Sequence, residues 1–392
     1  MSAATPPAAT GPLRDVKVLD IATMLAGPYG ATLLGDLGAD VIKVETPRGD
    51  ACRTMGPTLG DTSGVYHGVN RNKRGITVDL RSDTGRQTLT RLLDWADIVV
   101  MNQLPSVKQA LGVDPDSLDR DHPHLISVSA STFGETGPNA GRPGIDPVAQ
   151  ALSGFMAVTG ITGGEPTKSG PPVADSVASL LVAVGALAAL WERRNSGAGQ
   201  HVEVTLIDGL IHVQAPYVGQ YFLLGTQQPR TGNSTDWYAP YNSYTCGDGG
   251  RIQLACHNDK FFARVAEAIG RADLAGDPRF ATNEERLQHR DELDATIQGY
   301  CETMSREDVL DRLWAHDVIV GPVYDYAETF SDPQVLHNEM VVEFETSSGP
   351  VRTAGVPLRF SSTPGSVRRP PPALGEHTDE VLAELGIIES PA

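Results

Sequence analysis

Residues 16–45 read VKVLDIATMLAGPYGATLLGDLGADVIKVE, and this stretch decides the fold class. It divides into an apolar strand-like run at 16–21, a helix-like run at 27–37 and a second strand-like run at 41–45. Short connections that contain glycine separate the three runs. Because two parallel strands need a crossover between them, this order predicts a parallel α/β sheet.

The same alternation continues along the chain. We expect further strands at 75–80, 98–101, 125–130 and 201–206, an amphipathic helix at 84–96 and a long apolar helix at 177–191. These runs together predict a large, Rossmann-like, doubly wound α/β domain. Ligands in such folds bind at the carboxyl ends of the strands, so a site is expected in the loops that follow the strands.

A change of pattern after residue 237 predicts a second, smaller α+β domain. The 392 residues exceed the usual length of one domain. A hairpin-like pair flanks 246–250, charged helical sequence follows it, and a C-terminal helix at 379–385 is expected to dock back on the large domain. The expected boundaries are a large domain at 14–210 completed by 345–392, a loop-rich linker at 211–237, a small domain at 238–325 and a return linker at 326–344.

Composition excludes several classes of partner. The net charge of -18 argues against non-specific binding to nucleic acid or to an anionic membrane surface. The apolar run 177–191 is shorter than the roughly 20 residues that span a bilayer, so we expect a buried helix there and no membrane partner. The first fifteen residues lack the basic and apolar regions of a signal peptide and are expected to form a disordered leader.

The cysteines and histidines indicate no metal site. Four cysteines are scattered without the close pairs of a zinc site or a redox dithiol, and they are few for a secreted scaffold. The histidines show no metal-ligand spacing. We therefore expect a protein of the reducing cytoplasm that binds no metal.

One aspartate stands at the start of the long apolar helix. Residues 170–176 read GPPVADS, so Asp175 is the single charge before an otherwise uncharged helix. A plain N-cap is the commonest role for such a residue, because its side chain accepts a hydrogen bond from a free amide of the first turn. A catalytic carboxylate is the alternative, and residue type alone leaves both open.

Two common kinds of site do not fit the motifs. Residues 25–30 read LAGPYG, which is not the G-x-G-x-x-G spacing of a dinucleotide site, so no permanently bound cofactor is expected. A G-x-S-x-G elbow is also missing, which disfavours a serine thioesterase.

Several segments together resemble the family III CoA-transferases, the group that includes formyl-CoA transferase and carnitine CoA-transferase, with α-methylacyl-CoA racemase as a related branch. The resemblance covers nearly the whole chain. The order and spacing of the segments carry it. They are VLD at 18–20, LAGP at 25–28, GDLGADVIKVE at 35–45, NRNKR at 70–74, GP at 137–138, PGID at 143–146, Asp175, GAGQ at 197–200 and GEHT at 375–378.

The resemblance implies that Asp175 is a covalent nucleophile. It would form a mixed anhydride with the donor acid and then an aspartyl-CoA thioester, which a second carboxylic acid takes over. The implied substrates are an acyl-CoA and a free carboxylic acid. The family also implies an interlocked homodimer.

Further residues match family positions that bind coenzyme A. Leu25 and Ala26 would line the pantetheine and thioester, and Asn102 would contact the adenine or pantetheine region. At the phosphates and the nucleotide end the resemblance places Arg53, Asn72, Lys73 and Arg74.

The chain departs from the family pattern at several positions. Thr46 stands where formyl-CoA transferase-like members carry arginine, and Arg48 or Lys108 is expected to substitute for nucleotide-binding arginines. Ile145 stands where racemases carry histidine, which favours transfer over racemisation. Asp146 either orders the site by hydrogen bonding or is a turn residue.

Three questions stay open at the level of sequence. An acyl-CoA racemase, isomerase or CoA-dependent lyase of the same fold is the alternative enzyme, and a non-catalytic acyl-CoA-binding protein is the alternative of another class. Donors to an acyl oxyanion could come from glycine turns that equally read as hairpin turns, at Gly232–Asn233, Gly247 and Gly249–Gly250.

Overall fold

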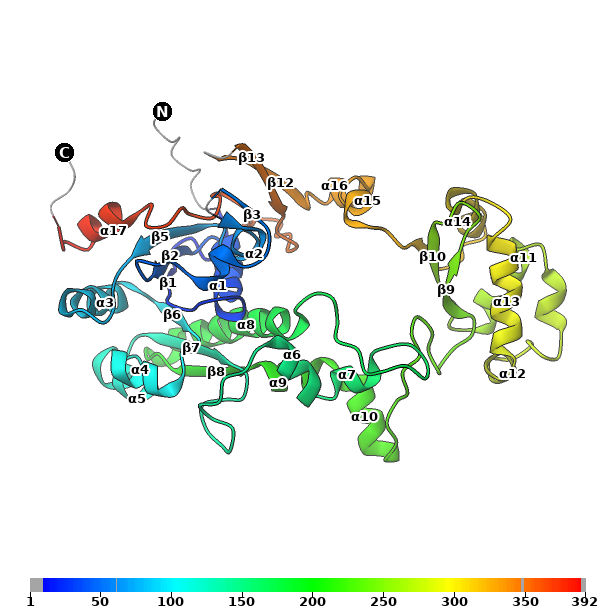
Figure 1. Ribbon diagram of the computed structural model, residues 1–392, viewed down its shortest axis with the longest axis horizontal. Coiled ribbons are helices and arrows are strands. Elements are labelled where there is room, and N and C mark those ends of the chain that lie inside the picture. Colours follow the sequence, from blue (N-terminus) through cyan, green and yellow to red (C-terminus); the bar gives the residue numbers. More distant parts are fainter. Residues whose placement is uncertain (1–9, 61, 347–348, 389–392) are drawn as a thin grey trace. The chain divides into compact units, whose positions relative to one another are not determined.

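The structure is a computed structural model that describes residues 10–60, 62–346 and 349–388 (Figure 1). It divides into two compact units. The first comprises Met1–Phe155, Ser169–Phe222 and Pro333–Ala392, and the second comprises Met156–Lys168 and Leu223–Asp332. The second unit thus contains all of the expected small domain, while the expected domain and linker boundaries stay predictions. Residues 1–9 of the expected leader lie outside the described residues.

Six strands form the sheet of the first unit in the order β5-β2-β1-β6-β7-β8. Each neighbouring pair is parallel, so the expected parallel, doubly wound sheet is confirmed. The order reverses between β1 and β6, as in the Rossmann fold, and a crevice at such a switch point is where ligands bind. The bounds are β1 Lys17–Asp20, β2 Asp40–Glu45, β5 Lys73–Thr77, β6 Ile98–Met101, β7 Ile126–Ser131 and β8 His201–Thr205.

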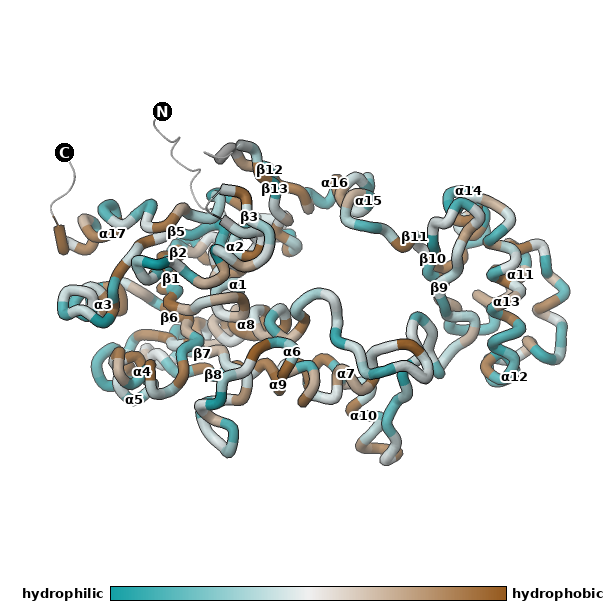
Figure 2. The backbone as a smooth tube through the Cα atoms, viewed as in Figure 1, coloured by the Kyte–Doolittle hydropathy of each residue, from teal (hydrophilic) through white to brown (hydrophobic). Residues whose placement is uncertain are grey.

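Helices cover both faces of this sheet (Figure 1). Helices α1 (Ala26–Asp36) and α8 (Val173–Ser196) pack on one face, and α3 (Asp83–Trp95), α4 (Pro105–Leu111) and α5 (Pro115–Asp121) lie on the other. Successive strand residues point to opposite faces, so Val18 joins the core under α1 and α8 while Leu19 joins the core under α3. A strand buried on both faces reads as a continuous apolar run, as β6 does (Figure 2).

Helix α8 is longer than the sequence pattern predicted. It begins directly after Pro171 and Pro172 and ends at Gly197, whose φ of 76° is a left-handed C-cap. Its 24 residues make it long and apolar enough, by length and composition only, to cross a membrane. The expectation that this segment is too short to do so is therefore wrong. One such helix is weak evidence for a membrane span, and α8 packs along α1 and β7 as a core helix does.

The C-terminal segment docks on the edge strand β5, as expected (Figure 1). The His377 amide donates to Gly75 O at 2.9 Å, and the Thr77 amide donates to Thr378 Oγ1 at 3.1 Å. Helix α17 (Thr378–Glu384) then holds Arg74 through a 2.6 Å ion pair with Glu384. The tail thereby covers the exposed edge of the sheet.

Shorter elements complete the first unit. One of them is an antiparallel hairpin of β12 with β13. The linker at 211–237 was expected to be loop-rich, which is wrong over its first part, because α9 ends at Val213 and α10 spans Ala215–Leu224. Pro216 stands in the first turn of α10, where proline is compatible with a helix. The elements are η1 Ala51–Thr54, β3 Thr58–Leu59, β4 Thr62–Ser63, α2 Gly64–Val69, α6 Asp146–Leu152, α9 Leu206–Val213, α10 Ala215–Leu224, α16 Pro333–His337, β12 Val341–Thr346 and β13 Gly349–Ala354.

The second unit combines a three-stranded antiparallel sheet with helices around a core of its own. The expected hairpin around 246–250 is confirmed, because the Cys246 amide donates to Gly250 O in the turn between β9 and β10. The elements are β9 Tyr241–Thr245, β10 Arg251–Ala255, α11 Asp259–Ala268, η2 Ala272–Gly276, α12 Asn283–Gln288, α13 Arg290–Cys301, α14 Arg306–Ala315, β11 Val320–Pro322 and α15 Tyr326–Thr329. Helix α7, Phe155–Val158, joins the two units in sequence.

Candidate active site

Asp175 is the third residue of α8 and does not cap the helix. The N-cap position is Pro172, and no side-chain capping bond is present there. The plain-cap interpretation of Asp175 is therefore wrong. Its carboxylate is half-buried and accepts no side-chain hydrogen bond from the part of the chain that the structure describes.

Asp146 supplies the missing cap from another helix. Asp146 Oδ1 accepts hydrogen bonds from the amides of Ala174, at 2.7 Å, and Asp175, at 3.4 Å. Its other oxygen accepts from Gln150 Nε2 at 2.6 Å, and Gln150 Oε1 in turn accepts from the Ser169 amide at 2.9 Å. Of the two interpretations of Asp146, ordering of the site is the one that this geometry favours.

The surroundings of Asp175 make its carboxyl group unusually basic. Burial raises its pKa from 3.8 to about 7, and the nearby Asp146 charge acts in the same direction. The positive end of the helix dipole opposes this rise. Because this carboxyl group is partly ionised at neutral pH, the nucleophilic carboxylate form is present. Because it is poorly solvated, it attacks more readily than a hydrated carboxylate does.

The loop between β1 and α1 lies at the switch point of the sheet and contacts the next loop along. Asn102 follows β6, and its side chain accepts from the Thr23 amide at 2.9 Å and donates to Thr23 O at 2.6 Å. Leu25 and Ala26 follow directly. The structure therefore brings the predicted residues Leu25, Ala26 and Asn102 to one edge of the sheet. Since both ends of the Asn102 amide are used on Thr23, its contact with a ligand stays a prediction.

Ser179 connects this loop to the helix that carries Asp175. Its hydroxyl lies 3.0 Å from Ala26 O and 2.8 Å from Asp175 O. Ser179 is buried and stands one helical turn after Asp175. The predicted thioester loop and the predicted nucleophile thus share one contact residue.

Arg53 is held inside the protein. It follows β2 in η1, where its guanidinium forms a bidentate pair with Glu45 at 2.7 and 2.6 Å and lies 3.7 Å from the Tyr66 ring centroid. It also donates to Pro372 O. These contacts pair its charge and use its Nε and Nη2 donors without a ligand, so its contact with CoA phosphates stays a prediction.

The other predicted nucleotide residues lie at the opposite, amino end of β5. Asn72 donates to Asp36 at 2.8 Å, Lys73 to Asp20 at 2.8 Å, and Arg74 to Asp40 at 2.7 Å. All three predicted residues are buried, Lys73 completely. Burial lowers the pKa of Lys73 to about 8, although Asp20 acts to raise it. The structure does not bring them to Asp175, and their role at the nucleotide end stays a prediction.

Of the two expected substitutes for missing arginines, only one is exposed. Lys108 is buried and paired with Ser129 and Glu135. Arg48 follows β2, is exposed, and forms no ion pair within the described part of the chain. Arg48 is therefore the better candidate to meet an anionic ligand.

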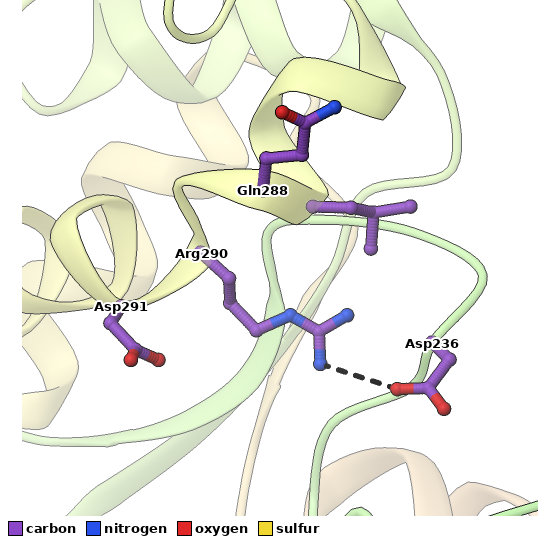
Figure 3. A pocket seen from close by; sticks show the side chains of 5 residues that line it. Asp236, Gln288, Arg290 and Asp291 are labelled. Carbon is purple, nitrogen blue, oxygen red and sulfur yellow. Dashed lines mark ion pairs between the residues drawn. The ribbon is translucent and has the colours of Figure 1, made fainter.

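A separate open pocket of about 450 Å³ belongs to the second unit (Figure 3). Arg290 points toward Asp236 there, with 3.9 Å between Nη1 and Oδ1, and also donates to Ser234 Oγ. None of the predicted site residues lines it. The glycine turns at Gly232 and Gly249 also belong to this unit, so an oxyanion role for them stays untested. Over residues 10–60, 62–346 and 349–388, no group of three His, Cys, Asp or Glu could hold a metal ion.

A model described as CoA-transferase family III matches residues 13–378. The chain belongs to this family. It is therefore an enzyme, a transferase, of a family that uses CoA thioesters as substrates. The resemblance on which the sequence analysis depended is confirmed.

Similar proteins agree over nearly the full length. A succinyl-CoA–D-citramalate CoA-transferase from Chloroflexus aurantiacus is 35% identical over 393 residues, covering 99% of this chain and 97% of that protein. A succinate–glutarate CoA-transferase from Agrobacterium fabrum is 37% identical over 391 residues, covering 97% of each. The solved structure of a CAIB/BAIF family protein from Brucella suis superposes with a TM-score of 0.88 at 36% identity, covering 96% of this chain and 100% of that one.

Sequence reasoning missed three residues that hold the backbone around the candidate site. Ser179 was detectable as a polar residue four positions after Asp175 on an apolar helix. Lys43 was detectable as a charge inside the buried strand β2, which requires a buried partner. That partner is Asp50, 3.0 Å away, whose role depends on a loop conformation that the sequence does not specify.

Proposed function

We propose that the protein transfers CoA from an acyl-CoA thioester to a free carboxylic acid through covalent intermediates on Asp175. The observation that carries the proposal is the Asp175 carboxylate itself. It makes no capping hydrogen bond, it is half-buried, and its pKa is raised to about 7. It stands on a helix that contacts the loop at the switch point of the sheet.

The first half-reaction forms an aspartyl thioester. An Asp175 carboxylate oxygen attacks the thioester carbonyl, the C–S bond breaks, and CoA leaves as the thiolate, which gives a mixed anhydride. The thiolate then attacks Cγ of Asp175, so the aspartyl C–O bond of the anhydride breaks and the donor acid departs as its carboxylate. The enzyme now holds CoA on Asp175.

The second half-reaction reverses these steps with another acid. Its carboxylate attacks Cγ of the aspartyl thioester and releases the thiolate, and the thiolate attacks the acyl carbonyl of the new anhydride. The new CoA ester and the free Asp175 carboxylate are the products. The thioester bond energy is conserved, and every step uses a nucleophile and a leaving group that are already in the site.

For the substrates we propose succinyl-CoA as donor and a small dicarboxylic acid as acceptor. The names of the two relatives, one acting with D-citramalate and one with glutarate, support this choice. The CoA thioester is proposed to lie against Leu25 and Ala26, and the exposed Arg48 is proposed to meet its phosphates. Ile145, exposed before Asp146, supports transfer over racemisation, because no histidine is available there to move an α-proton.

We further propose a homodimer in the cytoplasm. An exposed apolar stripe runs along α8 at spacings of three and four residues, and contiguous exposed apolar surface of this kind is typical of protein–protein interfaces. It consists of Leu180, Val184, Leu187 and Trp191. The four cysteines are all free and buried, as suits a reducing compartment.

The test is turnover with a panel of acids. Purified protein is mixed with succinyl-CoA and, separately, glutarate, citramalate, malate and acetate, and new CoA esters are separated by chromatography. We expect a new CoA ester with at least one dicarboxylate and none with Asp175→Asn. Exchange of the α-proton of an acyl-CoA in heavy water without any acceptor acid would instead support racemisation, and binding without turnover would support a binding protein.

A further inference from the structure

The contact between Ser179 and Ala26 links two elements that the proposed reaction must align. A helical serine ordinarily donates to the carbonyl four residues earlier, which here is Asp175 O at 2.8 Å. Ser179 has in addition a second acceptor at 3.0 Å, Ala26 O, at the point where the loop before α1 passes into the helix. One hydroxyl proton is thus shared between the backbone of the nucleophile and the backbone of the loop.

The packing of α1 against α8 leaves no room for sliding at this contact. A Cβ placed on Gly30 would lie 2.5 Å from Val182 Cγ1 and 3.2 Å from Ser179 O. The two helices therefore approach as closely as a glycine permits, one turn beyond Ala26. The position of α1 relative to Asp175 is fixed by this approach together with the Ser179 bond.

The loop before α1 is also held from its other side. Met24 has a φ of 70°, a left-handed conformation that a non-glycine residue adopts only when its surroundings impose it. Both oxygens of Asp50 accept from the Met24 amide at 3.2 Å, and Lys43 holds Asp50 at 3.0 Å. Backbone strain of this kind is concentrated at functional sites.

Resting on the proposed function, we infer that Ser179 is a positioning residue that keeps the thioester loop, Leu25–Ala26, in register with the Asp175 carboxylate. Attack requires the reacting atoms to lie about 3–3.5 Å apart, and a displacement of about 1 Å lowers the rate on the order of 100-fold. Ser179 touches neither the carboxylate nor the thioester. Its hydroxyl sets the distance between the backbone of Ala26 and the backbone of Asp175.

The experiment compares Ser179→Ala with a matched change on the same helix, Ser176→Ala. Ser176 also donates to a carbonyl four residues earlier, Pro172 O at 2.9 Å, but it has no bond to α1. The readout is the rate at which saturating succinyl-CoA forms a covalent CoA adduct on Asp175, together with the apparent KM for succinyl-CoA and the Tm. For Ser179→Ala we expect an adduct rate about 10- to 100-fold lower, with the KM within about twofold. Ser176→Ala should retain the wild-type rate.

A second pair of variants tests the same contact between α1 and α8 without changing Ser179, with the Tm as the check on folding. Gly30→Ala pushes α1 away from α8 and should lower the adduct rate by at least as much as Ser179→Ala, again with little change in KM. Gly68→Ala, in a helix where an added Cβ meets nothing within 4 Å, is its control. A similar fall in rate for Ser176→Ala or Gly68→Ala would overturn the inference, as would wild-type rates in Ser179→Ala.

The inference and the proposed function fail in different ways. An adduct on wild-type Asp175 that forms equally fast in Ser179→Ala refutes the positioning role and leaves the transferase mechanism intact. The complete absence of an adduct on the wild-type protein refutes the proposed mechanism, and the positioning role falls with it.

Discussion

Asp175 differs from the aspartates that cap other helices of this protein. Asp114 caps α5, and although burial acts to raise its pKa, the hydrogen bond from Ser117 holds that pKa below its ordinary value. Asp325 similarly accepts from Glu328 in a capping box. Asp175 lacks such a bond, and its pKa rises to about 7. The protein therefore leaves one carboxylate at a helix start without the stabilisation that the others receive.

This unsatisfied carboxylate predicts a pH-dependent gain in stability for Asp175→Asn. Because the folded pKa of Asp175 is raised from 3.8 to about 7, its contribution to stability is fully present below about pH 4 and is lost as the pH rises to 7. The free energy of unfolding of the Asn variant relative to wild type should increase by about 3 kcal/mol between pH 5 and 7 and level off above pH 7. Thermal unfolding at four pH values measures it. An advantage independent of pH would show that the raised pKa is wrong.

Substitutions of Lys73 and Arg48 distinguish a cation that stabilises the fold from a cation that binds the substrate. Lys73→Met leaves Asp20 buried beside Lys43 alone, 3.8 Å away, and should destabilise the fold by about 3–5 kcal/mol while the folded fraction keeps its KM for acyl-CoA. Arg48→Ala should leave the Tm unchanged and raise that KM about tenfold, since a charged hydrogen bond to phosphate is worth about 1.5–3 kcal/mol. Denaturant unfolding and steady-state kinetics check both. A raised KM in folded Lys73→Met would restore the nucleotide role that the resemblance implies.

Helix α6 provides the N-terminal cap of helix α8. The start of α8 is capped by Asp146 from α6, whose carboxylate accepts from two backbone amides of α8 and places one negative charge near the nucleophile. The cap holds the first turn in place, and the charge keeps the Asp175 carboxyl basic.

Two substitutions of Asp146 separate these effects. Asp146→Asn keeps an acceptor for the Ala174 amide and removes the charge, so the pKa of Asp175 should fall and the lower limb of the pH–rate profile should move to lower pH. Asp146→Ala also removes the cap and should cost about 1–2 kcal/mol of stability. Rate profiles from pH 5 to 9 and unfolding curves measure the two. An unchanged profile in Asp146→Asn would show that its charge does not reach Asp175.

The sequence predicted features that depend on neighbouring residues and missed those that depend on residues far apart along the chain. Periodicity placed β6 at its observed bounds and β1, β2 and α1 within a residue, because those signals are local. The partners of Lys73 and Arg74 could not be predicted in this way. Arg74 meets Glu384, 310 residues away, and Lys73 meets Asp20, 53 residues away. Residues that the resemblance places at the nucleotide end are thus paired with carboxylates that no local pattern identifies.

The whole molecule is built from two units, each with its own hydrophobic core. Alternation of strands and helices predicted the doubly wound sheet, and the change of pattern predicted a second unit. The family resemblance, and not periodicity, identified Asp175, Leu25 and Ala26 as one site. Ser179 stands out on its apolar helix, but its bond to Ala26 O is visible only in the structure, because such a serine is ordinarily bonded to its own helix backbone.

The exposed stripe of α8 predicts the oligomeric state. If a second copy covers it, Leu180→Glu combined with Val184→Glu should convert a dimer into a monomer, because two charges would be buried without partners. Val107→Glu, at an exposed apolar position of α4, is the control and should remain dimeric. Light scattering coupled to gel filtration gives the mass. A monomeric wild type, or a dimer that survives both changes on α8, would contradict the proposed interface.

The most direct test of the central claim is mass spectrometry of the protein during turnover. Wild type and Asp175→Asn are mixed with succinyl-CoA, quenched, digested and analysed for the peptide that contains residue 175. We predict a CoA-sized mass increase on that peptide in the wild type, discharged by adding an acceptor dicarboxylate, and none in Asp175→Asn. An unmodified wild-type peptide under conditions of measurable CoA transfer, or a modification that persists in Asp175→Asn, would contradict the account.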